Sequence, residues 1–97
     1  MNQEQKIELF NRLARHIRPA FQEYKDVTSL DAELKDTGLD SLDFVMMGIY
    51  LSTLYGVREE ISKNFAPTTV GGFFDLNEAH KTEDPPATVD ECMEMVK

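Results

Sequence analysis

The segment Asp36–Val45, DTGLDSLDFV, contains the residues best placed to do chemistry. Gly38 permits a turn, Asp40 or Ser41 can begin a helix, and Asp43 follows near the third helical position. Both carboxylates can accept hydrogen bonds from the free N–H groups of a first helical turn, and their negative charge suits that end of the helix dipole. We therefore expect the Ser41 hydroxyl to lie on the first turn of a helix and to face solvent.

A phosphate group attached to Ser41 would meet unpaired N–H groups and a favourable dipole. It would also be repelled by Asp40 and Asp43, so the site should tolerate a singly charged phosphodiester better than a phosphomonoester. The less specific alternative is that Ser41 only caps a helix. A small hydrolase using Ser41 is the weakest alternative, because the sequence has no Gly-x-Ser-x-Gly elbow and no histidine placed as a base.

The residues that follow Ser41 predict a helix over 41–55 that is apolar on two sides. One stripe contains Phe44, Met47, Gly48, Leu51, Leu54 and Tyr55, and the other contains Leu42, Val45, Met46 and Ile49. A helix that is apolar all round is normally buried, but a chain of 97 residues can hardly surround one completely. One stripe should therefore face the core, and the other should be covered by another segment or offered to a partner.

The remaining patterns predict an all-α chain without repeats. Apolar spacing and capping residues predict helices over 3–18, over 59–65 and after Thr68 or Thr69, the last with Val70, Phe73, Phe74 and Leu76 inward. The connection 19–40 leads into an acidic run, which is either a solvated loop or a docking surface for a basic partner. Its acids, with those that follow, are Asp26, Asp31, Glu33, Asp36, Asp40 and Asp43.

The last part of the chain leaves three alternatives open. Val89, Cys92, Met93 and Val96 share helical spacing after a Pro-Pro break. Residues 81–97 are thus a flexible tail, a short docked helix, or a segment that orders on binding. If the helix docks, the stripe at Val45, Met46 and Ile49 offers it a place. We expect a helical domain over 1–80 and an acidic extension over 81–97.

Composition excludes several classes of function. The net charge of −8 disfavours nucleic acid and anionic membranes as partners. One cysteine and two histidines exclude a disulfide framework and make a metal centre unexpected. No apolar stretch approaches the roughly 20 residues of a membrane span, and the first ten residues lack the apolar region of a signal peptide. We expect a cytoplasmic chain that acts as a monomer.

The hexapeptide GLDSLD at residues 38–43 resembles the modification motif of acyl carrier proteins. That motif is a Gly-x-Asp-Ser-Leu core opening the second helix of a four-helix bundle. The similarity covers residues 7–78 and includes the amphipathic first helix, the long acidic loop, the turn at Tyr55–Val57 and the run Thr68–Val70. It implies a four-helix acyl-carrier-like bundle with a long loop between helices 1 and 2, to which a short C-terminal helix would be extra.

The resemblance also implies a function and its residues. A phosphopantetheinyl transferase would move the 4′-phosphopantetheine group of coenzyme A onto Ser41, with Asp40 and Leu42 beside it, using magnesium that belongs to the transferase reaction. The thiol of this arm would carry acyl groups as thioesters between acyl-loading and acyl-transfer enzymes, so the chain itself would not be an enzyme. Partner recognition is expected at Asp36, Asp43, Val45, Met46 and Ile49, and an acyl cavity at Val45, Met47, Leu51 and Phe73.

Departures from the family pattern indicate a specialised member. The glutamates typical of the second helix are replaced by Met46, Ser52 and Thr53, while Glu59 and Pro67 occupy positions that are usually apolar. A dedicated pathway of fatty acid, envelope-lipid or lipopolysaccharide, or polyketide type is therefore expected. An aminoacyl or peptidyl carrier, and an unmodified interaction module with the same fold, remain alternatives.

Overall fold

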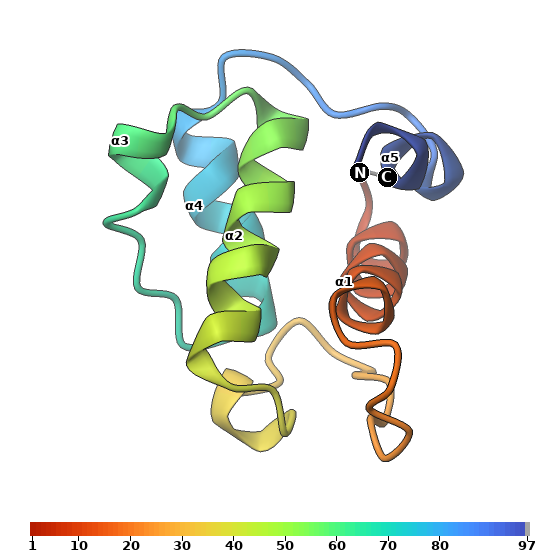
Figure 1. Ribbon diagram of the computed structural model, residues 1–97. Helices are drawn as coiled ribbons and strands as arrows, with labels where there is room; N and C mark the ends of the chain where they lie inside the picture. The colour runs from red at the N-terminus through yellow and green to blue at the C-terminus, as the bar shows by residue number, and fades with distance from the viewer. Residues whose placement is uncertain (97) are drawn as a thin grey trace.

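A computed structural model describes residues 1–96, which fold into five α-helices and one 3-10 turn (Figure 1). The elements are α1 (Gln3–Ile17), η1 (Leu34–Asp36), α2 (Ser41–Tyr55), α3 (Glu59–Ser62), α4 (Val70–His80) and α5 (Val89–Val96). Within residues 1–96 the only β-type pairing is an isolated bridge between Glu33 and Thr69. The prediction of an all-α chain is confirmed. Lys97, the last residue of the expected extension, lies outside the described residues.

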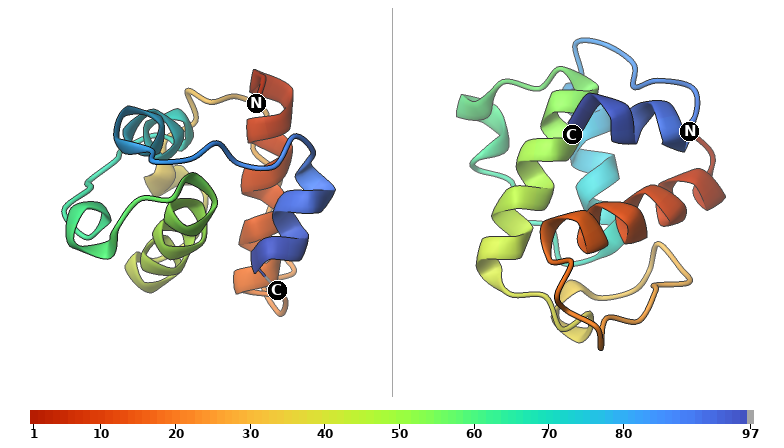
Figure 2. Two further views of the ribbon diagram at one scale, coloured as in Figure 1. Left: turned by 90° about the horizontal axis from the view of Figure 1, so that it is seen from above. Right: turned by 45° about the vertical axis from the view of Figure 1, so that its right-hand side comes forward.

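The helices form two groups around one core. Helices α1 and α5 lie side by side and run across the direction of α2 and α4, while α3 stands beyond α2 on the side away from α1 (Figures 1 and 2). Side chains from all four long helices meet between the groups and are almost completely shielded from solvent. They include Leu9, Phe10, Leu13, Met47, Leu51, Leu54, Val70, Phe74 and Cys92.

Helix α2 has a clear start and a clear end. Asp40 is its N-cap, and its side chain accepts a hydrogen bond from the Asp43 N–H. Gly56 ends it in the left-handed region at φ 66°, where its N–H bonds to the carbonyls of Ser52 and Thr53. Glycine is favoured there because other residues pay a steric penalty in that region. The range Ser41–Tyr55 matches the prediction from the sequence.

The C-terminal segment forms a docked helix. Val89, Cys92, Met93 and Val96 of α5 are buried, and α5 packs on α1 and α2. The expectation that it would cover the stripe at Val45, Met46 and Ile49 is wrong, since Val45 and Ile49 remain 57% and 47% exposed.

Two attachments explain where α5 goes. The N–H groups of Thr82 and Glu83 bond to the Tyr55 carbonyl at the end of α2. Beyond them, Asp90 pairs with Arg12 of α1 over 2.6 Å. The chain is therefore led to the α1 side of the molecule, away from the exposed stripe.

The long connection between α1 and α2 is held by its backbone. Three N–H groups link it to the start of α4: Leu34 to the Thr68 carbonyl over 2.9 Å, Val70 to Ala32 over 3.0 Å, and Gly71 to Leu30 over 2.8 Å. Leu34 and Leu39 of this connection are buried. The connection thus fixes the approach of the chain to Ser41.

Candidate functional site

Ser41 is the first residue of α2 and is exposed. A reciprocal capping box surrounds it: Asp43 N–H donates to Asp40 Oδ1, and Asp40 N–H donates to Asp43 Oδ2, each over 3.0 Å. Within residues 1–96 the Ser41 hydroxyl has no hydrogen-bond partner of its own. The serine therefore lies at the positive end of a helix with its oxygen accessible.

The turn before Ser41 has little freedom. Gly38 adopts φ 82°, and a Cβ there would lie 3.0 Å from the Phe21 ring. The Thr37 hydroxyl donates to the Leu34 carbonyl over 2.7 Å and accepts from the Leu39 N–H over 3.3 Å. These contacts hold the serine in one place relative to the 19–40 connection.

The two aspartates of the motif have different environments. Asp40 is exposed, and the hydrogen bond from the Asp43 N–H lowers the pKa of its carboxyl, with Arg18 adding to the effect. Asp43 is only 5% exposed, and its Oδ2 also accepts from Arg18 Nη1 over 3.1 Å. Asp43 is thus used inside the chain, and its expected role in partner recognition is not supported.

The exposed stripe of α2 starts at the serine. Leu42, Val45 and Ile49 are 70%, 57% and 47% exposed, and Met46 between them is half-buried. Asp36 on η1 is also exposed. Asp36, Val45, Met46 and Ile49, which were expected to contact partners, are thus at least partly accessible, whereas Asp43 is buried.

A pocket of about 350 Å³ opens beside Ser41, between α2, α3 and the segment that follows α3. Its size is at the lower end of the usual range of ligand pockets, roughly 300–1,000 Å³. The side chains around it are mainly apolar, with a few polar residues. The lining consists of Leu34, Ser41, Phe44, Val45, Gly48, Ile49, Glu59, Ser62, Lys63, Phe65, Ala66, Pro67 and Phe73.

Aromatic rings close the inner side of the pocket. The rings of Phe44 and Phe73 lie 6.3 Å apart, and Phe10 lies 6.4 Å from Phe73 on the core side. Val45 and Phe73 line the pocket as expected, whereas Met47 and Leu51 are fully buried and are not among the lining residues. The reason is helical spacing, which turns Met47 and Leu51 toward α1 and the core.

Gly48 opens the pocket from within α2. A Cβ at this position would meet only Phe73 Cε1, at an ordinary 3.9 Å. Neither a positive φ nor a close backbone neighbour requires glycine here, yet glycine inside a helix costs about 1 kcal/mol relative to alanine. The absent side chain leaves its volume to the pocket.

Sequence reasoning missed several residues of this site. Arg18 gave no signal, because a connection of more than twenty residues separates it from its partner Asp43. Glu59 and Pro67 were noted only as departures from the family pattern, but both line the pocket. Ser62, Lys63 and Phe65 gave no signal, because a four-residue helix has too little periodicity to orient its side chains.

Both histidines contact aromatic rings. The His16 ring contacts the Tyr50 ring at 5.5 Å, and the His80 ring lies 5.3 Å from Phe65. Neither histidine lines the pocket. Among residues 1–96, no group of three or more His, Cys, Asp or Glu side chains could hold a metal ion, and no helix is long and apolar enough to cross a membrane.

Comparisons with known proteins yield no relative. No protein-family model matches the chain, and neither the curated proteins nor the solved structures contain a match.

Proposed function

We propose that this protein is an acyl carrier that holds acyl intermediates as thioesters on a 4′-phosphopantetheine arm attached to Ser41. The observation that carries the proposal is the position of Ser41, an exposed hydroxyl on the first turn of α2 at the edge of an apolar pocket. The resemblance of GLDSLD to the carrier motif supports phosphopantetheine as the group attached at this position.

The residues around Ser41 fit a phosphodiester. The first N–H groups of α2 would meet its oxygens, and the helix dipole favours its single charge. Asp43 is paired with Arg18, so only the exposed carboxylate of Asp40 lies next to the attachment point without an ion pair of its own. When bound, the arm supplies a thiol that forms the thioester.

The attachment step needs coenzyme A and a transferase. The Ser41 oxygen attacks the phosphorus that carries the pantetheine group and forms a new P–O bond. The bond from that phosphorus to the remaining adenosine bisphosphate breaks, and the hydroxyl proton leaves to a base of the transferase. Asp40 and Leu42, which flank the attachment point and are exposed, would contact the transferase.

Recognition by acyl-loading and acyl-transfer enzymes would use the stripe at Leu42, Val45, Met46 and Ile49 with Asp36 beside it. This surface is apolar rather than glutamate-rich, which favours a dedicated set of partners in a fatty acid, envelope-lipid or lipopolysaccharide, or polyketide-type pathway. We further propose that the carrier is a cytoplasmic monomer.

The test is intact-mass analysis after incubation with coenzyme A, magnesium and a phosphopantetheinyl transferase of broad specificity. We expect a gain of one phosphopantetheinyl group, lost in Ser41→Ala and kept in Ser62→Ala, which removes a serine elsewhere on the pocket wall. Failure of several transferases to modify a folded chain would contradict the proposal and favour an unmodified interaction module. Loading with amino acids but not with acyl groups would favour an aminoacyl carrier instead.

A further inference from the structure

The wall of the pocket is chemically uneven. Its residues from α2 and α4 are apolar apart from Ser41, whereas Glu59, Ser62 and Lys63 all come from α3 and its end. Figure 1 shows α3 beside the C-terminal half of α2, away from the N-terminal end of that helix. Ile49, which also lines the pocket, lies eight positions after Ser41, or about 12 Å along the helix.

The polar side carries two opposite charges, Glu59 and Lys63, which are both exposed at the rim of the pocket. Within the described part of the chain, neither Glu59 nor Lys63 has a side-chain ion pair, although they are one helical turn apart. Their neighbours Arg58 and Glu60 pair with each other instead. A charged ligand group would be attracted by one of the two and repelled by the other. A hydroxyl suits both, because it can donate to Glu59 and accept from Lys63.

Aromatic rings limit how deep an acyl chain can enter the pocket. The rings of Phe44 and Phe73 close its floor, and behind them Met47 and Leu51 are fully buried. A long alkyl chain could go deeper only by displacing these rings from a packed core. Gly48 adds to the space above these rings, because no neighbouring atom fills the volume that a side chain would take there.

We propose that the pocket selects a short acyl chain bearing a hydroxyl group, with Gly48 providing the space and Glu59 and Lys63 binding the hydroxyl. This inference rests on the proposed function. It names the cargo by its length and its polar end, and it distinguishes this carrier from one for long saturated chains.

The experiment first loads Ser41 in one step with acylated coenzyme A and a broad transferase, and checks the product by intact mass. The cargoes are ω-hydroxybutanoyl and pentanoyl, which have equal numbers of non-hydrogen atoms, and dodecanoyl. Cleavage of each thioester by hydroxylamine then reports shielding of the acyl group. We expect ω-hydroxybutanoyl to react about two- to tenfold more slowly than pentanoyl, the factor that one net hydrogen bond supplies, and dodecanoyl to be the least shielded.

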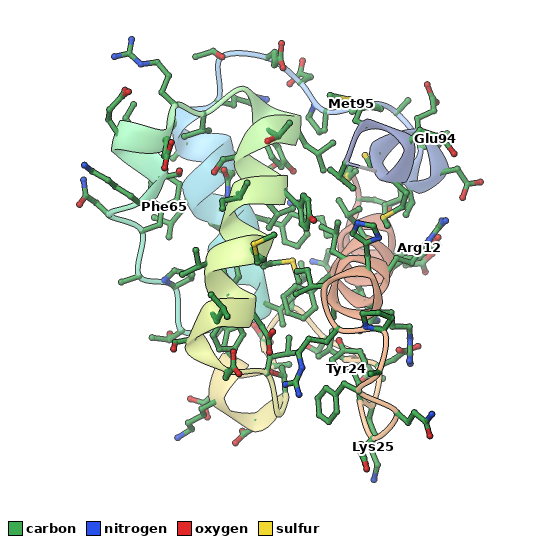
Figure 3. The ribbon with its side chains drawn as sticks, in the orientation of Figure 1. Arg12, Tyr24, Lys25, Phe65, Glu94 and Met95 are labelled. Carbon is green, nitrogen blue, oxygen red and sulfur yellow. The ribbon has the colours of Figure 1, made fainter. Side chains whose placement is uncertain are left out.

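Variants distinguish the contribution of the polar residues from that of the space at Gly48. Glu59→Gln with Lys63→Met should abolish the difference between the two short cargoes. Lys25→Met, which removes a charge at the opposite end of the molecule, should preserve it (Figure 3). Gly48→Leu should expose both short cargoes to hydroxylamine, and Gly48→Ala should reduce shielding less.

Two sets of outcomes are distinguishable. If no cargo is loaded onto the folded chain, the proposed function fails and this inference fails with it. If loading succeeds but pentanoyl and ω-hydroxybutanoyl react at equal rates, or dodecanoyl is shielded best, only the inference is overturned. It is also overturned if Gly48→Leu leaves shielding unchanged.

Discussion

Arg18 donates from Nη1 to Oδ2 of Asp43 over 3.1 Å and so joins the end of α1 to the first turn of α2. The Asp43 side chain is 7% exposed and the Arg18 side chain 39%. The same carboxylate oxygen accepts the Asp40 N–H. One ion pair therefore helps to hold the backbone that presents Ser41.

Removing this ion pair should destabilise the fold more than removing an exposed one. We expect Arg18→Ala to lower the free energy of unfolding by about 1–3 kcal/mol, because it leaves a buried carboxylate without its cation. Arg15→Ala is a matched control. Like Arg18, Arg15 stacks on an aromatic ring and pairs with an aspartate, here Asp26. The side chains of Arg15 and Asp26 are both more than half exposed, so the expected loss is below about 1 kcal/mol. Urea denaturation measures both, and equal losses would contradict the role given to Asp43.

Two glycines should respond oppositely to alanine. Gly48→Ala should raise the free energy of unfolding by about 0.5–1 kcal/mol, because the new methyl group meets only Phe73 at 3.9 Å and helix propensity improves. Gly56→Ala should lower it by at least about 1 kcal/mol, because φ is 66° and a Cβ would lie 2.5 Å from Thr82 Oγ1. Thermal and urea unfolding test the pair. A loss of stability in Gly48→Ala would mean that the pocket does not have the space described.

Two buried tyrosines form a second matched pair. The Tyr24 hydroxyl donates to Asn11 Oδ1 over 2.7 Å, so Tyr24→Phe should cost about 0.5–1.5 kcal/mol of stability. The Tyr55 hydroxyl is buried without a hydrogen-bond partner in residues 1–96, so Tyr55→Phe should leave stability unchanged or increase it. Chemical denaturation of the two variants decides. A clear loss in Tyr55→Phe would show that its hydroxyl is hydrogen-bonded in solution.

The pH dependence of the N-cap has a definite sign. The pKa of Asp40 is lowered in the folded chain, so ionised Asp40 stabilises the fold above its ordinary pKa of about 3.9, and this contribution is lost as the pH falls through the lower, folded value. Asn caps helices nearly as well but does not titrate. The stability advantage of the parent chain over Asp40→Asn should therefore shrink between neutral pH and pH values below about 3.9. Unfolding curves at several pH values measure it, and a constant difference would contradict the assignment.

The rate at which a thiol reagent labels Cys92 reports whether α5 is docked. Cys92 is fully buried and burial raises the pKa of its thiol, so a thiol reagent should react slowly with the unmodified chain. Met93→Asp, at a position 6% exposed, should speed labelling at least about tenfold by releasing α5. Met95→Asp, on the same helix but 48% exposed, should leave the rate nearly unchanged. Equal rates in all three chains would show that α5 does not protect Cys92.

Local signals in the sequence predicted most of the fold. Helical spacing and the caps at Asp40 and Thr69 place α2 at its observed bounds and the start of α4 within one residue. Which helices pack against each other was less predictable, because the apolar face of a helix does not specify the surface that it contacts. The docking place of α5 was therefore missed. The prediction that Leu76 faces the core is also wrong, because Leu76 is only half-buried. The next residue, Asn77, is fully buried instead, and it bonds to the Phe73 carbonyl and to Ser52.

The candidate site was predictable to the same degree. The position of Ser41 at the start of α2 and its capping by Asp40 depend only on adjacent residues, so both could be predicted from the sequence. Asp43 looked exposed because its partner, Arg18, comes from another helix. The pocket depends on how α3 and the segment 63–67 are placed opposite Gly48 and its neighbours on α2, a tertiary arrangement that no local pattern encodes.

The three main-chain hydrogen bonds between the 19–40 connection and the start of α4 involve no side-chain atom. Substitution of charged side chains such as those of Asp31, Glu33 and Lys35 therefore leaves these hydrogen bonds intact. The electrostatic character of that face can drift in evolution, and can be redesigned, without disturbing the architecture beneath it. Changes of surface charge on this face can therefore alter which partners the chain binds while Ser41 stays where it is.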